Sequence, residues 1–431
     1  MALADIAVPT GFLVVAIIAI VAQSILLIVA LFDPGLRYKI DHAELQDMDR
    51  REFLHSLEVV TDAQLSRDAR LEVLTNGEQY YEAELAAIRE AEHTINLEAY
   101  IFQRGEVADR FIGALAERAR AGVEVRVVLD GVGSAMTTKR DFAPVIDAGG
   151  KLAFYHPLRF TKLPRYNHRT HRELLVIDGL VGFAGGAGVA DHWFVTTPDR
   201  LRWRDTMVRL EGSVVNHLQA TFAENWLEAC GELIVGNRHF PDCPPAGNSE
   251  VLVVNSTPSA GGSSRARVLF QMLLASARKT IHITTPYFLP DRSIAGELVR
   301  AVERGVDVKV LVPGRHADHF LTRSSSRLAY GRLLPHGVRI FEYAPTMVHA
   351  KILIVDSHWA VFGSTNFDNR SFGLNDEVNV AVCDDGFASR LEEDFQRDVA
   401  ETHEVSYEQW KDRSLLERGP ELLGWLLERQ Q

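Results

Sequence analysis

The chain has 431 residues, of which 46% are hydrophobic and 24% charged, the composition of a folded globular protein long enough for two domains. Its formal net charge of −12 at pH 7 argues against general nucleic-acid binding, because such a surface needs clustered cations. Three widely spaced cysteines, Cys230, Cys243 and Cys383, form no metal or redox motif, so we expect no disulfide framework and no metal centre.

The first strong feature in chain order is an uncharged apolar run at residues 9–32. As a helix this run would be roughly 36 Å long, which is enough to cross a bilayer core. A cleaved signal peptide is the alternative, but it requires a basic N-terminal region and a shorter apolar stretch. The residues before the run carry Asp5 and no lysine or arginine. The sequence therefore predicts a retained transmembrane anchor.

The charges around this run predict how the anchor is oriented. Basic residues follow the run closely and none precede it: Arg37, Lys39, Arg50 and Arg51. Because cytoplasmic flanks carry the excess of lysine and arginine, we expect a single-pass protein whose body lies in the cytoplasm. The charged segment at residues 33–70 is interpreted as a linker between the anchor and the body.

A repeat dominates the rest of the chain. Residues 91–130 and 277–313 each contain a strand pattern, an aromatic turn, an amphipathic helix ending near a glycine (Gly122, Gly305) and a valine-rich strand. Strands that alternate with helices are typical of βαβ units. The repeat predicts an α/β fold of two halves, with mostly parallel sheets covered by helices.

Polar residues gather at the start of an apolar segment in the second half. His349 and Lys351 precede the buried-strand pattern at Ile352–Val355, and residues two apart on a strand point to the same side. Ser364 and Asn366 follow the next short strand pattern, Trp359–Phe362. Histidine, a cation and neutral donors in one place suit a phosphoryl group. The ordinary alternative, a buried strand pair with a satisfied histidine, does not explain the whole set.

A weaker copy of this motif lies upstream. His171 and Asp178 have the same spacing as His349 and Asp356, and Gly185-Gly186 follows at the offset of the later small-residue pair. A basic and aromatic segment at residues 156–171 precedes it and suits either anionic lipid headgroups or plain solvent.

These two motifs resemble those of the phospholipase D superfamily, whose mark is a duplicated His-x-Lys-x4-Asp pattern followed by Gly-Gly or Gly-Ser and Asn. Within it the chain is similar to the bacterial cardiolipin synthase group. The resemblance implies two fused phospholipase D-like α/β/α halves, which we expect at residues 71–250 and 251–400, followed by a C-terminal helical extension at 401–431. Many cardiolipin synthases have two membrane spans, so the single run at 9–32 is a departure.

The resemblance also implies a mechanism through a covalent phosphohistidine. It makes His171 the nucleophile and His349 the general acid, with the reverse assignment open because the first motif is degenerate. Histidine suits both tasks because its ordinary pKa of about 6.5 is close to working pH. The superfamily holds each imidazole by an acidic residue, and Asp205 and Glu377 follow the first and second motifs. Asp178 and Asp356 are expected to fix the motifs, with phosphate contacts from Lys351, Ser364 and Asn366.

Two departures from the pattern concern the first motif. The lysine slot holds Glu173 and the asparagine slot holds Gly188. At an effective dielectric of about 20, two unit charges about 4 Å apart interact by about 4 kcal/mol, so an ionised glutamate beside phosphate needs compensation. Glu173 is therefore expected to pair with a nearby arginine (Arg169, Arg172 or Arg204), to turn away, or to hold a proton.

The resemblance thus implies a phosphatidyltransferase of the cardiolipin synthase type, without metal or cofactor, and the predicted anchor places it in the inner cell membrane. It would join two phosphatidylglycerol molecules and need no nucleic acid or obligate protein partner. A phospholipase D hydrolase, with water as acceptor, shares the first half-reaction and remains an alternative. A nuclease of the same superfamily fits less well with the anchor and the acidic charge. A lipid-binding protein without turnover is the alternative that Glu173 and Gly188 suggest.

Overall fold

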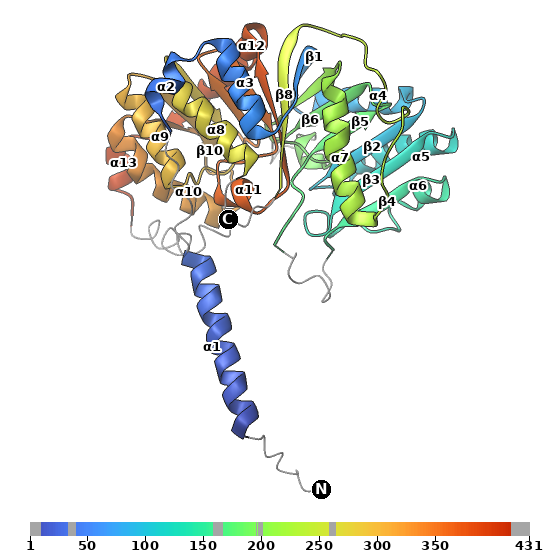
Figure 1. Cartoon of the computed structure of the whole chain (residues 1–431), viewed down its shortest axis with the longest axis horizontal. Coiled ribbons are helices and arrows are strands. Elements are labelled where there is room, and N and C mark those ends of the chain that lie inside the picture. The colour runs from blue at the N-terminus through green and yellow to red at the C-terminus, as the bar shows by residue number, and fades with distance from the viewer. Residues whose placement is uncertain are drawn as a thin grey trace. The chain divides into compact units, whose positions relative to one another are not determined.

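The computed structural model describes residues 10–32, 40–157, 167–194, 196, 201–257 and 264–414 (Figure 1). Two compact units are present, Met1–Arg37 and Tyr38–Gln431. The first unit contains a 23-residue helix, α1 (Thr10–Phe32), with no acidic residue in its first turn and no basic residue in its last. Within the described residues, no helix is long and apolar enough to cross a membrane, so the transmembrane span predicted at 9–32 is not confirmed.

The second unit is built on one sheet of 15 strands in the order β15-β11-β10-β9-β12-β13-β14-β8-β1-β7-β6-β5-β2-β3-β4. The strands of the two repeats lie towards its two ends, and the two halves of the sheet join where β8 and β1 pair. In chain order the strands are β1 (Leu65–Thr75), β2 (Thr94–Ala99), β3 (Glu124–Asp130), β4 (Lys151–Tyr155), β5 (Leu174–Ile177), β6 (Val181–Gly185), β7 (Thr206–Glu211), β8 (Ser249–Ser256), β9 (Thr280–Thr284), β10 (Asp307–Pro313), β11 (Arg339–Tyr343), β12 (Ile352–Val355), β13 (Trp359–Gly363), β14 (Glu377–Cys383) and β15 (Thr402–Glu404).

The prediction of a mostly parallel sheet is wrong, because the sheet is mixed. Parallel pairing occurs at β2-β3, β3-β4, β9-β10 and β10-β11, the strands joined by crossover helices. The strands that follow each motif histidine are instead joined by short turns, which permit only antiparallel pairing. Thus β5 pairs antiparallel with β6, and β12 with β13. The error came from extending the βαβ pattern of residues 91–130 to the whole half.

The repeat itself is confirmed. In the first copy α5 (Glu106–Arg120) connects the parallel strands β2 and β3, and in the second α9 (Arg292–Glu303) connects β9 and β10. Each helix is followed by a glycine with positive φ, Gly122 at 93° and Gly305 at 92°. Backbone with positive φ favours glycine, which explains why both copies of the repeat place one there.

Helices cover both faces of the sheet (Figure 1). One apolar core lies under the outer helices of the first half and another under those of the second. A third core is shared, because it joins α7 and α12 to strands of both halves. The helices of the body are α2 (His42–Asp47), α3 (Arg50–Thr61), α4 (Gly77–Glu90), α5, α6 (Ala143–Asp147), α7 (Val214–Cys230), α8 (Arg265–Ser276), α9, α10 (Phe320–Leu333), α11 (Asn369–Gly373), α12 (Asp385–Val399) and α13 (Tyr407–Lys411), with short 3-10 helices η2 (Asp191–Trp193) and η3 (Leu334–His336).

The C-terminal extension contains β15 and α13 within the described residues, and residues 415–431 lie outside them. The divisions expected at 70/71, 250/251 and 400/401 stay predictions. Most of the basic and aromatic segment, residues 158–166, also lies outside the described residues.

Candidate active site

The second motif enters the sheet as the sequence predicts. Strand β12 covers the four apolar residues Ile352–Val355 and lies between β9 and β13. His349 and Lys351 precede it, and both are 5% exposed. The backbone N–H of His349 donates to the carbonyl of Arg204 at 2.7 Å, and Val348 forms a bridge with Arg204. A segment of the first half therefore holds the start of the second motif.

His349 is paired with a carboxylate. Its Nδ1 lies 2.8 Å from Oδ2 of Asp205, which is fully buried. Asp205 also accepts from the indole Nε1 of Trp193 at 3.0 Å and from the backbone N–H of Thr206 at 2.8 Å. Burial alone would raise the pKa of Asp205, but the hydrogen bond from His349 and the charges of His349 and Lys351 outweigh it and lower that pKa. Asp205 is thus held ionised.

The environment also sets the charge of His349. Burial and the ammonium of Lys351 lower its pKa, against the opposing effect of Asp205. The Nζ of Lys351 lies 2.8 Å from Nδ1 and 3.1 Å from Nε2 of the imidazole, and donates to the His349 carbonyl at 2.8 Å. Burial lowers the pKa of Lys351 itself to about 8. Both shifts favour the uncharged forms of these two groups, and Lys351 titrates near the working pH.

His171 is held in a similar way by the other half. Its Nδ1 lies 3.2 Å from Oε2 of Glu377 and 3.0 Å from the carbonyl oxygen of Ser364. Both neighbours are acceptors, so Nδ1 carries the proton and Nε2 holds the lone pair in the neutral ring. The backbone N–H of His171 donates to the Asp376 carbonyl at 2.9 Å. Glu377 is fully buried, so its carboxylate is shielded from water.

The two acidic residues are exchanged between the halves. Asp205 follows the first motif in the sequence but holds the histidine of the second motif, and Glu377 follows the second but holds the histidine of the first. The small residues that follow the motifs also contact the opposite half. An added Cβ at Gly186 would meet Asp205 Oδ1 at 2.7 Å and Lys351 Cδ at 3.1 Å. Glycine at this position lets the two motifs approach each other closely.

The predicted phosphate contacts differ in their availability. The hydroxyl of Ser364 donates to Glu377 and accepts from the backbone N–H of Val378 at 3.1 Å, so it supports the carboxylate that holds His171. Asn366 is 3% exposed, and its Oδ1 has no hydrogen-bond partner among the described residues. A buried amide with an unused oxygen is costly unless something binds it. This oxygen can only accept a hydrogen bond, so it suits a hydroxyl group of a substrate; the donors that phosphate oxygens need are the Nζ of Lys351 and the Nδ2 of Asn366.

Asp178 and Asp356 serve the same structural task in the two halves. The carboxylate of Asp178 accepts from the backbone N–H groups of residues 92, 93 and 94 at 2.6–2.8 Å. That of Asp356 accepts from those of residues 278, 279 and 280 at 2.7–2.9 Å. Each aspartate thus connects the end of its motif strand to the start of β2 or β9.

Glu173 follows none of the arginine pairings that the sequence suggested. Arg169, Arg172 and Arg204 form ion pairs with Asp130, Glu224 and Asp398 instead. The Oε1 atom of Glu173 accepts from the backbone N–H groups of Tyr100 at 3.1 Å and Ile101 at 3.2 Å. Burial raises the pKa of Glu173 well above its ordinary value. The first motif therefore carries a carboxyl group whose protonated form is favoured by burial, where the second carries a lysine.

Aromatic side chains that the sequence analysis did not single out surround both histidines. The rings of Trp193 and Trp203 lie 5.3 Å and 5.4 Å from that of His349, and Tyr100 packs edge-on against His171 at 5.0 Å. The position of Trp203, two residues before Asp205, and of Tyr100, in the aromatic turn of the repeat, was the signal available. These rings exclude water and so strengthen the electrostatic interactions of the imidazoles.

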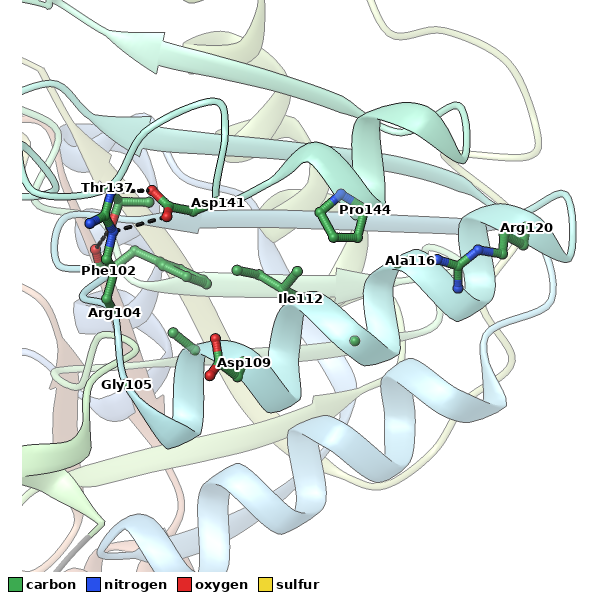
Figure 2. A pocket seen from close by; sticks show the side chains of 12 residues that line it. Phe102, Arg104, Gly105, Asp109, Ile112, Ala116, Arg120, Thr137, Asp141 and Pro144 are labelled. Atoms are coloured by element: carbon green, nitrogen blue, oxygen red, sulfur yellow. Dashed lines mark hydrogen bonds and ion pairs between the residues drawn. The ribbon is translucent and has the colours of Figure 1, made fainter.

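A separate cavity of about 560 Å³ lies along α5 (Figure 2). Its lining includes neither histidine. At one end of it Arg104 pairs with Asp141 at 2.9 Å. No group of three or more His, Cys, Asp or Glu side chains within the described residues is arranged to hold a metal ion. The lining residues are Phe102, Arg104, Gly105, Ala108, Asp109, Ile112, Gly113, Ala116, Arg120, Thr137, Asp141 and Pro144.

Comparisons with known proteins identify the family of the chain. The family model "Cardiolipin synthase, PLD-like domain" matches residues 85–226 and 270–399. The major cardiolipin synthase ClsA of Bacillus subtilis is 32% identical over 382 residues, which are 88% of this chain and 79% of that protein. A cardiolipin synthase of Alkalihalophilus pseudofirmus is 33% identical over 357 residues, 82% of this chain and 71% of that protein.

Among solved structures, phosphatidylserine synthase of Haemophilus influenzae matches with a TM-score of 0.64 and 14% identity, covering 88% of this chain and 97% of that one, which shows a shared fold. The duplicated fold and its paired histidines are those of the phospholipase D superfamily. Within it, the chain belongs to the cardiolipin synthase family and is a phosphatidyltransferase. Family membership favours this activity over the nuclease and the non-catalytic lipid-binding alternatives.

Proposed function

We propose that the enzyme makes cardiolipin from two molecules of phosphatidylglycerol, releasing glycerol, through a phosphatidyl-histidine intermediate. The observation that carries the proposal is the pair of imidazoles, each with Nδ1 held by a buried carboxylate of the opposite half. This arrangement leaves Nε2 of His171 for attack on phosphorus and Nε2 of His349, which lies 3.1 Å from Nζ of Lys351, for proton transfer. The family membership and the names of the cardiolipin synthase relatives support the choice of product.

In the first half-reaction, Nε2 of His171 attacks phosphorus, so that a P–N bond forms and the bond from phosphorus to the glycerol oxygen breaks. His349, as an imidazolium, gives its proton to the departing glycerol oxygen. Burial and the charge of Lys351 lower the pKa of His349. A bound phosphodiester raises that pKa, because a nearby anion favours the protonated ring. The substrate therefore helps to charge its own general acid.

In the second half-reaction, His349 accepts the proton of the acceptor hydroxyl while the acceptor oxygen attacks phosphorus. The P–N bond breaks and His171 returns to its neutral form. Lys351 and Asn366 bind the phosphate oxygens, whose charge is offset by the ammonium. Glu377 stabilises the positive charge that develops on His171 as the P–N bond forms, as Asp205 does for protonated His349.

The test is lipid analysis of the purified full-length protein incubated with vesicles of phosphatidylglycerol, with His171→Ala and His349→Ala as controls. Cardiolipin and free glycerol in equal amounts, absent in both variants, are the expected result. Phosphatidic acid in place of cardiolipin would make water the acceptor and the enzyme a phospholipase D. Cardiolipin formation that survives in either variant would contradict the two-histidine mechanism.

We further propose that α1 attaches the enzyme to the inner cell membrane, with the body in the cytoplasm. Large aliphatic side chains on α1 are exposed, at 66% for Val15 and 62% for Ile18 and Ile20, and burial in lipid would remove this surface from water. Removal of residues 1–39 is expected to release the protein from membranes on fractionation. A truncated protein that still sediments with membranes would contradict attachment by α1, and protease access in sealed vesicles tests the orientation.

A further inference from the structure

Glu173 occupies the slot of the first motif that corresponds to Lys351 in the second, yet the two side chains run in opposite directions. Lys351 reaches towards the other half, with Nζ 3.5 Å from the carbonyl oxygen of Gly186. Glu173 turns back into its own half and accepts the backbone N–H groups of Tyr100 and Ile101. It is 6% exposed, so water does not replace these hydrogen bonds.

The second departure of the first motif, Gly188, is spatially linked to the first. A Cβ at Gly188 would lie 3.0 Å from Oε1 of Glu173 and 2.4 Å from the carbonyl oxygen of Ile101. No real side chain accepts such a contact with backbone. The segment after β2 therefore contacts Gly188 directly. The backbone N–H of Val189 donates to the carbonyl oxygen of Ile101 at 2.8 Å. Glu173 and Gly188 therefore form one local arrangement, and they are not two independent losses of motif residues.

This arrangement bears on catalysis through Tyr100. The ring of Tyr100 packs edge-on against His171, with centroids 5.0 Å apart. Its backbone is fixed on one side by Glu173 and on the other by the hydroxyl of Ser134, which donates to the Tyr100 carbonyl at 2.8 Å. Loss of the Glu173 contact would free one side of this support and let the imidazole leave its attacking position.

We propose that Glu173 is a positioning residue of the reaction, whose carboxyl clamps the backbone of Tyr100 and Ile101 so that the Tyr100 ring holds His171 in line with phosphorus. The proposal rests on the proposed function, because His171 is its reacting group. The clamp requires an acceptor oxygen at this position and no charge. It follows that a lysine at residue 173, the residue type that the second motif has at Lys351, inactivates the enzyme, since an ammonium would face two N–H donors.

The test compares Glu173→Gln, Glu173→Lys and Glu173→Ala in the full-length enzyme on phosphatidylglycerol vesicles. Glutamine keeps the acceptor oxygen and the neutral charge, so its kcat is expected within about threefold of wild type. Lysine and alanine are expected to lower kcat at least about tenfold with KM little changed, because a displaced nucleophile weakens the chemical step. Glu84→Gln, at a buried glutamate elsewhere in the first half, is the matched control and should behave as wild type.

Each alternative outcome gives a different experimental result. Turnover of Glu173→Lys equal to or above wild type would overturn the proposal, because the slot would then tolerate a cation. A lowered melting temperature with unchanged kcat in Glu173→Ala would also overturn it, by reducing Glu173 to a stability role. If the decrease of kcat/KM at high pH occurs at a different pH in Glu173→Gln than in the wild type, Glu173 is ionised near Lys351. That result would contradict the neutral clamp. Wild-type protein that forms phosphatidic acid would reject only the acceptor in the proposed function, since the same comparison applies to that product.

Discussion

The two halves of the body repeat the same histidine and aspartate but differ at the position between them. In both halves the aspartate accepts three backbone N–H groups, and in both the histidine Nδ1 meets a buried carboxylate of the other half. At the third position one half has Lys351 and the other Glu173. Each imidazole needs its own aspartate and carboxylate to orient it, so these residues occur twice. One phosphate needs only one ammonium to offset its charge in this site, so a lysine in one half is enough.

The largest expected effect on turnover comes from removing each histidine in turn, which tests whether the two halves have different roles. His171→Ala and His349→Ala are both expected to lower turnover by at least about 10³-fold, because each removes a group that makes or breaks a bond. The two should differ in the trapped intermediate. With a donor whose leaving group needs no proton, His349→Ala should accumulate phosphatidyl-histidine and His171→Ala should not, as quenched protein labelled from radioactive lipid would reveal.

The opposite labelling pattern would assign the nucleophile to His349, and label in both variants would contradict a single nucleophile. His336→Ala, at an exposed histidine of η3, is the control for a histidine change as such and should retain wild-type turnover.

The exchanged carboxylates allow a sharper test. Asp205→Asn and Glu377→Gln are each expected to reduce kcat by about 10²- to 10⁴-fold, because an amide can hold the wrong tautomer of its histidine. Asp205→Asn should be the more severe, since Asp205 lies 2.8 Å from its imidazole and Glu377 3.2 Å from its own. Steady-state kinetics on both variants provides the measurement.

Cross-half pairing also predicts the pattern of double variants. Asp205→Asn should add little to His349→Ala, because the carboxylate acts through that ring, and the same holds for Glu377→Gln with His171→Ala. Independent effects of Asp205→Asn and His349→Ala on residual turnover would contradict the pairing.

Lys351 is expected to set an alkaline limit to activity. Burial lowers its pKa to about 8, so the ammonium that binds phosphate is lost as the pH rises above that value. The kcat/KM profile of the wild type should fall with an apparent pKa near 8. Lys351→Arg should retain the charge at higher pH and flatten this limb, at some loss of activity, because guanidinium has a different shape. An unchanged limb in the arginine variant would assign the limit to another group.

The same shift has a defined consequence for stability. Between about pH 8 and the ordinary lysine pKa of about 10.4, the unfolded chain binds the proton of Lys351 and the folded one does not. Stability from this residue therefore rises with pH through that window, where activity falls. Opposite trends in urea unfolding and in turnover between pH 7.5 and 9.5 would identify Lys351 as the shared cause.

The local sequence predicted the motif strands well and their partners poorly. The apolar run Ile352–Val355 is a strand over the predicted residues, because its pattern depends on neighbours in the chain. The backbone partners of Asp178 and Asp356 lie 76 to 86 residues away, so the sequence pattern did not identify them. Strand direction and the exchange of Asp205 and Glu377 depend on how the two halves face each other. No periodicity within a half encodes that contact, and the commitment of the Ser364 hydroxyl to Glu377 is hidden for the same reason.

The smallest expected effect concerns the two aspartates that are equivalent in the halves. Asp178→Ala and Asp356→Ala each remove an acceptor of three backbone N–H groups, and residues 92, 93, 278 and 279 can turn to water for part of the loss. We expect each variant to lose about 1–3 kcal/mol of unfolding free energy, by similar amounts, and to keep most of its turnover at 20 °C. Asp147→Ala, an exposed residue at the end of α6, should change stability by less than about 0.5 kcal/mol. Equal losses of stability with retained turnover would place both aspartates in the frame of the motifs, whereas a large loss of kcat in one alone would show that the halves differ in their frames as well as in their charge.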